Sequence, residues 1–381
     1  MRTSTSVRAC GVVIIAGLLA ACSSSGSGSS GTAAGTLAST KSSSAAYQQA
    51  VTLTQQAETR PTSLTVPSLP AKPPSGKTLD FMVCGVPACL DMAALAKSAV
   101  EAAGWKFVPI QQGLSQQAWV SAYQQVVLNH PDAVIGTGIG ALSLIGHELQ
   151  QLKNEGVPVV EVSAPATPAE PGVIGVTNST PQTEQFGREL AEWVLADSHA
   201  ANAHVLYVDI PDQPVYVAQE SAFSQVLDAG CSSCSVSTLI QPGTSLDNGM
   251  ATAISSYLLS HPDINYVFGA FTDILDGLPA ALQSNGTTSK VKLITDDTQS
   301  TEDQYLLHGQ EAATAAVPWA ESLWGAFNLI LTDIEKAPLG PAQNIAYPNM
   351  IFTGKTLLTT SAMPPLVANY EEIFKAAWHL G

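Results

Sequence analysis

"LNHPDAVIG", residues 128–136, recurs further along the chain as "LSHPDINYVFG", residues 259–269. In both copies an amphipathic pattern precedes the His-Pro pair. The residue before a proline disfavours the helical backbone, so each predicted helix ends at this pair. An Asp then leads into a short apolar run, which is typical of a buried strand. The chain is therefore expected to use one helix-loop-strand unit in each of two similar halves.

Apolar runs alternate with amphipathic segments on both sides of the first copy. Strands are expected at 78–85, 105–110, 132–138 and 157–163, and helices at 91–103, 115–129 and 142–155. Asp91 is expected to cap the first of these helices and Gly104 to end it. Such alternation is typical of a parallel sheet with helices on both faces. The predicted fold class is α/β, with two similar parallel-sheet lobes.

The stretch "GTGIGA", residues 136–141, approximates a dinucleotide-binding fingerprint, because Glu161 follows one strand later. In that fingerprint the glycines approach a pyrophosphate and the acid holds a ribose hydroxyl. However, two predicted strands precede this stretch, whereas the fingerprint belongs on the first strand. The second copy of the repeat is followed by "AFTDILDG", residues 270–277, which has no such glycines. The glycines are therefore interpreted as one loop variant, and an exported dinucleotide-dependent oxidoreductase remains the alternative.

The N-terminus has the layout of a secretion signal. Arg2 and Arg8 precede an apolar run at 10–21 that is too short to span a bilayer. The run ends in "LAAC", residues 19–22, which resembles the bacterial lipobox, in which the signal is cut before the Cys and that Cys is acylated. The prediction is a lipoprotein signal peptide at 1–21, lipid attachment at Cys22 and a place on the extracytoplasmic face of the cell membrane. An ordinary signal peptide with an incidental Cys is the alternative.

Composition divides the rest of the chain into a tether and a folded part. Residues 23–46 are almost entirely Ser, Gly, Ala and Thr, which bury too little surface to fold, and the Pro-rich stretch 61–74 is expected to extend them. A disordered tether is therefore predicted over 22–76. The remaining roughly 300 residues are enough for two lobes. The formal net charge of −16 disfavours nucleic acid and anionic lipid as partners.

Four of the six cysteines lie beyond the signal and its attachment site. In an oxidising compartment, Cys231 and Cys234 are expected to form a short disulfide, with a redox centre as the alternative. Cys84 and Cys89 flank a predicted loop, where either a disulfide or two separate thiols is possible, because strand geometry can point the side chains apart.

The order of these motifs resembles the type I periplasmic solute-binding proteins, particularly the branch that serves sugar ABC importers. The resemblance covers roughly 77–341 and rests on "AALAKSAVEAAGW", "QQVVLNHPDAVIGTGI", "NEGVPVVEVSA", "VIGVTNSTPQTEQFGRELAEWV", "HPDINYVFGAFTDILDGLPAAL" and "VKLITDDTQ". It implies two lobes joined by crossings near 176–178, 317–319 and 343–346. The N-lobe would comprise 77–177 with 319–342, and the C-lobe 178–318 with 343–381.

The function implied is that of a monomeric, lipid-anchored substrate-binding protein, which traps a small ligand by hinge closure and passes it to an ABC permease. A sensor that signals to a membrane kinase is the alternative within the same fold. No enzyme activity, cofactor or metal is predicted, because the seven histidines show no metal-ligand spacing and no nucleophile motif occurs.

Ligands of parallel sheets bind beyond the carboxyl ends of the strands. The loops at these ends supply the predicted ligand-binding residues: Asp91, Gln112, Thr137, Ser163, Asp212, Tyr216, Gln219, Phe271, Asp273, Asp296 and Trp319. Asp296 keeps the place of a ligand-binding Asp of the family, whereas Gln219 and Phe271 replace a common Arg and Asn. Each of these residues also has a purely structural interpretation, such as core packing of Phe271 or helix capping by Asp296. The loops contain no Lys or Arg, so a neutral or cationic polar ligand, sugar-like or ring-containing, is expected.

Overall fold

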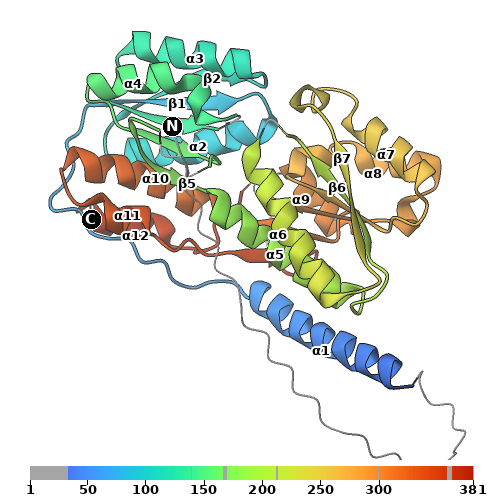
Figure 1. Ribbon diagram of the computed structural model, residues 1–381. Helices are drawn as coiled ribbons and strands as arrows, with labels where there is room; N and C mark the ends of the chain where they lie inside the picture. The colour runs from blue at the N-terminus through green and yellow to red at the C-terminus, as the bar shows by residue number, and fades with distance from the viewer. Residues whose placement is uncertain are drawn as a thin grey trace, which may run out of the picture. The chain divides into compact units, whose positions relative to one another are not determined.

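The computed structural model describes residues 33–138, 140–165, 170–211, 213–298, 300–357 and 363–380. Residues Lys41–Gly381 form one compact unit that contains two sheets (Figure 1). Cys22 and the predicted signal peptide lie outside the described residues. Within the described ranges, no helix combines the length and apolar character that crossing a bilayer requires.

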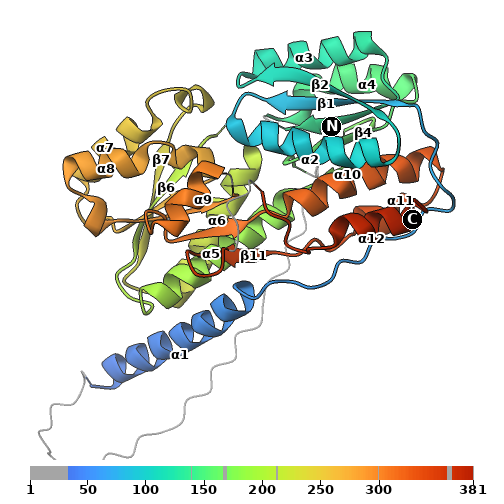
Figure 2. The ribbon, with the colours of Figure 1, turned by 180° about the vertical axis from the view of Figure 1, so that it is seen from behind.

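The first sheet belongs to the N-lobe and is parallel throughout. Its strands are β1 (Thr78–Cys84), β2 (Lys106–Gly113), β3 (Ala133–Thr137), β4 (Val159–Val162) and β5 (Val173–Thr177), in the order β2-β1-β3-β4-β5. Its helices are α2 (Pro87–Ala102), α3 (Gln116–Asn129), α4 (Gly146–Asn154), α10 (Trp319–Ile334), α11 (Leu339–Gln343) and α12 (Tyr370–Ala377). Figures 1 and 2 show α3 and α4 on one face and α2 and α10 on the other. The strand and helix pattern predicted for this half is confirmed.

Helix α2 begins four residues earlier than the sequence predicts. Val86 is its extended N-cap and Pro87 occupies the first turn, where the missing amide hydrogen of proline has no helical partner to lose. Asp91 therefore lies inside the helix and does not cap it.

The second sheet belongs to the C-lobe. Its strands are β6 (His204–Asp209), β7 (Ser235–Ile240), β8 (Tyr266–Gly269), β9 (Lys292–Asp296), β10 (Ala313–Ala316) and β11 (Met350–Phe352), in the order β11-β10-β9-β8-β6-β7. All neighbours are parallel except β10 and β11. The helices are α5 (Thr180–Asp197), α6 (Pro214–Gly230), α7 (Met250–Ser260), α8 (Leu278–Asn285) and α9 (Ser300–Leu307).

The repeated sequence forms the same unit in both lobes. In the first copy α3 leads into β3, and in the second α7 leads into β8. Both strands are fully buried. The chain thus builds each lobe around a repeated helix-loop-strand module, as the sequence predicts.

The tail does not stay in the C-lobe, so the assignment of all of 343–381 to that lobe is wrong. Strand β11 joins the C-lobe sheet, but α12 returns to pack on α10. The indole rings of Trp324 and Trp378 stack at 5.2 Å, and Trp378 Nε1 donates a hydrogen bond to Asn328 Oδ1 at 2.8 Å. Trp378 is fully buried, and burial of so large an aromatic surface explains the return.

The segment predicted as a disordered tether is ordered over its described part. Helix α1 spans Ala33–Ala57, and residues 58–76, here called the strap, pack along both lobes. The Arg60 guanidinium donates to Pro365 O at 3.0 Å and lies over the Phe352 ring. Towards the other end, Trp105 Nε1 donates to Pro74 O at 2.7 Å. The prediction failed because a few spaced apolar residues fasten this Pro-rich stretch, with Leu64 and Leu69 buried.

Candidate functional site

A cavity of about 60 Å³, here called the interlobe pocket, lies between the carboxyl ends of the two sheets. Both lobes contribute to its wall. Six of the predicted ligand-binding residues line it: Thr137, Ser163, Tyr216, Phe271, Asp273 and Trp319. The structure therefore brings together residues that are as much as 182 positions apart in the sequence.

The other four predicted residues that the structure describes do not line this pocket. Gln219 and Asp296 are buried but do not belong to its wall, and Gln112 is buried with Nε2 donating to Thr137 O at 3.0 Å. Asp91 lies half-buried in α2 and takes no part in the wall. Asp212 lies outside the described residues.

Asp297, which the sequence analysis did not select, lines the pocket in place of Asp296. Asp296 closes β9, and its Oδ2 accepts a hydrogen bond from Gln219 Nε2 at 2.5 Å. Asp297 has a φ of 80°, and its Oδ1 accepts hydrogen bonds from Trp319 Nε1 at 2.5 Å and Thr298 N at 2.6 Å. The indole of Trp319, at the crossing into α10, is thereby fixed to the end of β9. Two adjacent acids at a strand end were the available signal, but sequence alone does not tell which of the two faces the cleft.

Asp273, Asp296 and Asp297 form a buried group, here called the acid cluster; their exposed fractions are 4%, 3% and 5%. Burial raises the pKa of Asp297 to about 8, with further contributions from Asp273 and Asp303. Burial and the neighbouring Asp297 also raise the pKa of Asp296. None of the described lining residues is Lys, Arg or His. The described pocket wall therefore contains two acidic residues of the cluster and no basic residue.

Aromatic rings form the adjoining wall. The Tyr216 and Phe271 rings stack at 5.3 Å with an angle of 23° between their planes, and both line the pocket with Trp319. On the opposite side, the N-lobe contributes mainly apolar surface, which includes Val86, Met92 and Leu114 and continues across to Leu246 of the C-lobe. The sequence analysis missed these apolar residues because nothing in their local pattern distinguishes them from core positions.

Three non-glycine residues at strand ends have left-handed backbone. The φ angles are 56° at Ser163 after β4, 51° at Asn178 after β5 and 80° at Asp297 after β9. Asn178 Nδ2 donates to Ser163 Oγ at 2.9 Å, which ties the first crossing to the pocket wall. Such backbone costs on the order of 1 kcal/mol or more per residue and is concentrated at functional sites.

Two disulfides are present in the structure. Cys84 and Cys89 join the end of β1 to the first turn of α2, with Cα atoms 5.5 Å apart, and both line the interlobe pocket. Cys231 and Cys234 bridge the turn between α6 and β7, with Cα atoms 5.4 Å apart. Both separations lie in the usual range for disulfides. The first bridge therefore cross-links two residues of the pocket wall.

The glycine-rich stretch does not form a dinucleotide site. A Cβ atom at Gly136 would collide with the Tyr123 hydroxyl and the Glu161 carboxyl group, so the glycine accommodates these side chains in the core. Tyr123 OH donates a hydrogen bond to Glu161 Oε1, and burial raises the Glu161 pKa to about 8. Glu161 is fully buried, so it does not present a carboxylate to a ribose. The residues present do not fit the cofactor.

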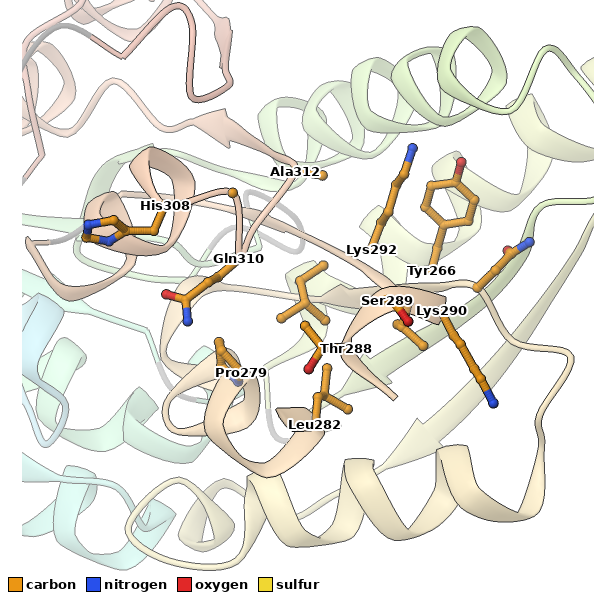
Figure 3. Close-up of a pocket in the computed structure, with 14 residues that line it drawn as sticks. Tyr266, Pro279, Leu282, Thr288, Ser289, Lys290, Lys292, His308, Gln310 and Ala312 are labelled. Carbon is orange, nitrogen blue, oxygen red and sulfur yellow. The ribbon is translucent and has the colours of Figure 1, made fainter. Parts of the chain in front are cut away.

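A larger hollow of about 440 Å³ lies at the other end of the C-lobe strands, beside Asn265, Lys292 and Ala312. Figure 3 shows the ammonium groups of Lys290 and Lys292 and the ring of His308 pointing in three different directions. Lys292 is also paired with Asp197 at 2.6 Å. This hollow thus lacks converging polar groups, which a binding site requires. Within the described ranges, no three His, Cys, Asp or Glu side chains are grouped as metal ligands.

Comparisons with known proteins agree with this geometry. Residues 87–331 match the family model described as "Periplasmic binding protein domain". No protein with curated function matches the sequence. Solved structures that are similar to the chain include an ABC sugar transporter subunit from Rhodobacter sphaeroides (19% identity, TM-score 0.61, covering 73% of this chain and 98% of that one). A glucose-galactose binding protein from Geobacillus stearothermophilus has 14% identity and a TM-score of 0.65, with coverages of 75% and 100%.

A solute-binding protein from Agrobacterium vitis with bound allitol has 17% identity and a TM-score of 0.62, with coverages of 79% and 99%. At these identities the structural matches establish the fold, which is that of type I periplasmic binding proteins, and the family model covers more than half of the sequence. The chain belongs to the periplasmic binding protein domain family.

Proposed function

We propose that this protein is the lipid-anchored substrate-binding component of an ABC importer. It captures a small neutral or cationic polar molecule between its lobes and delivers it to a membrane permease. The observation that carries the proposal is the interlobe pocket, where acidic and aromatic residues from strand ends of both lobes converge. Ligands of open α/β sheets bind at this edge.

The size of the pocket supports a hinge mechanism. A cavity of about 60 Å³ has room for only a few water molecules. Because its wall comes from both lobes, relative movement of the lobes is the direct way to admit a larger ligand and then enclose it. The crossings after β5 and β10 are the segments about which the lobes would turn.

A thermal-shift screen followed by X-ray scattering tests this function. The screen covers sugars, polyols, nucleosides, amines and aromatic metabolites, because a ligand that binds only the folded state raises the melting temperature. Phe271→Ala should abolish the shift, since it removes one of the two stacked rings of the wall. Leu128→Ala, at an exposed position, is the matched control and should retain it.

Scattering then measures the closure. The radius of gyration should decrease when the ligand identified by the screen saturates the protein. An unchanged radius at saturation would refute hinge closure, and failure of every compound to raise the melting temperature would count against the binding function.

A further inference from the structure

The interlobe pocket is polar on one side only. The acid cluster and the aromatic rings come from the C-lobe and the start of α10, whereas the N-lobe wall is largely apolar, with Thr137 and Ser163 as its polar side chains. A sugar carries hydroxyl groups around its whole ring, and each needs a partner when it is buried. An apolar body with one polar end matches this wall better.

The acidic residues of the pocket narrow the class of ligand further. Asp273 and Asp297 line the cavity, Asp296 precedes Asp297 at the end of β9, and all three are buried. The charges of Asp273 and of Asp303 in α9 raise the pKa of Asp297, and the charge of Asp297 raises the pKa of Asp296. Bringing several carboxylates together in a dry site is unfavourable unless a cation or protons neutralise them. A neutral ligand would leave this neutralisation to protons alone, whereas a cationic ligand would supply it directly.

The aromatic rings complement a cation as well. Tyr216, Phe271 and Trp319 all line the pocket, and the face of an aromatic ring attracts an ammonium group, more strongly when water is excluded. The indole of Trp319 is held in place by its hydrogen bond to Asp297. The aromatic rings and the carboxyl groups thus line the same small cavity.

From this arrangement we infer that the ligand is a small organic ammonium compound, whose cationic group lies against Asp273 and Asp297 and whose apolar part faces the N-lobe wall. The inference rests on the proposed binding function and narrows its ligand class. It also gives the acid cluster a role, in which the cluster releases a proton when the cationic ligand binds. Because the pKa of Asp297 is raised to about 8, the empty cluster retains a proton near neutral pH, and a bound cation favours its release.

A matched pair of probes tests the charge directly. Choline and its neutral carbon isostere 3,3-dimethylbutan-1-ol have the same shape, and the panel adds ethanolamine, putrescine, glucose, galactose and allitol. At least one ammonium compound is expected to raise the melting temperature, while the isostere and the sugars leave it unchanged. If a sugar or polyol binds and no ammonium compound does, the inference is overturned but the binding function stands. If nothing in the panel binds, the inference fails.

Variants and proton counting provide the second test. Asp297→Asn and Asp273→Asn should each weaken binding of the ammonium probe at least about tenfold, the usual effect of losing an interaction with a charged group. Asp276→Asn makes the same substitution at an exposed position three residues after Asp273 and should not change affinity. Circular dichroism confirms that the variants fold. Equal weakening by all three would show that only net charge matters and would overturn the proposed contact.

Calorimetry at pH 7 in two buffers of different ionisation enthalpy measures the proton exchange. Binding of the ammonium probe should release a fraction of a proton, and its affinity should rise from pH 6 to pH 8. Asp297→Asn should reduce the release. Binding without any proton release would contradict the proposed role of the acid cluster.

Discussion

Replacing Glu161 by Gln should remove a pH-dependent instability from the N-lobe core. Glu161 is fully buried, accepts a hydrogen bond from Tyr123 OH and has a pKa raised by burial from 4.5 to about 8. The folded protein therefore keeps this proton over a range in which the unfolded chain releases it. Stability falls as the pH rises from about 4.5 to about 8, and the loss is complete above that value.

The expected magnitude follows from the same shift. One pKa unit corresponds to about 1.4 kcal/mol, so raising the pH from 6 to 8 should cost about 2–3 kcal/mol at this group. Glutamine has nearly the same size, offers an oxygen to Tyr123 and does not titrate. The free energy of unfolding of Glu161→Gln should therefore gain about 2–3 kcal/mol relative to the unmodified protein across this range. The acid cluster titrates in both proteins and cancels from the comparison.

Urea unfolding followed by tryptophan fluorescence at several pH values between 5.5 and 9 measures this difference. Glu101→Gln, which removes an exposed acid in the same lobe, is the control and should follow the unmodified protein. Parallel pH profiles for Glu161→Gln and the unmodified protein would refute the reasoning, because they would mean that Glu161 does not titrate between the folded and unfolded states as proposed.

The remaining predictions concern the anchor, the disulfides, the tail and the hinge. Cys22→Ser should release the protein from the membrane fraction or block its processing; a variant that is cleaved normally and still partitions into detergent would refute lipid attachment. Mass spectrometry of unreduced, thiol-labelled protein should find Cys84, Cys89, Cys231 and Cys234 unlabelled, and labelling of all four would contradict both bridges. Trp378→Ala should lower the free energy of unfolding by about 3–5 kcal/mol, because it empties a fully buried aromatic site; a loss below about 1 kcal/mol would show that α12 is not part of the core. Val317→Trp, at the buried crossing before α10, should reduce the ligand-induced change in radius of gyration while leaving the unliganded radius nearly unchanged, and closure as large as in the unmodified protein would exclude this crossing as a hinge.

The α/β alternation and the repeated unit were predictable because both are local patterns. Buried strands such as 133–137 and the helix that ends at His130 follow from apolar periodicity and from the proline at 131. The return of α12 to the N-lobe was not predictable in this way. It depends on Trp378 meeting Trp324, a contact between residues that are far apart in sequence.

The candidate site was likewise predictable in part, where topology determines it, and unpredictable where it depends on contacts between distant residues. Strand-end loops supplied six of the eleven proposed residues to the pocket, because the edge at which parallel strands end is fixed by topology. The choice between Asp296 and Asp297 was beyond sequence, since it depends on the positive φ at Asp297 and on the indole that binds it. Gly136 belongs to a stretch that approximates a dinucleotide-binding fingerprint, but its missing side chain makes room for Tyr123 and Glu161 in the core and not for a cofactor.

The strap determines which N-terminal truncations leave the surface of the two lobes covered. Proteolysis before residue 58 would leave the strap in place, with every contact that the strap itself makes with the lobes. Cleavage after Pro74 would instead deprive Trp105 Nε1 of its acceptor and uncover the apolar surface beneath Leu64 and Leu69. A fragment beginning at residue 77 would thus expose apolar surface and would be prone to self-association, whereas one beginning near residue 45 would keep that surface covered.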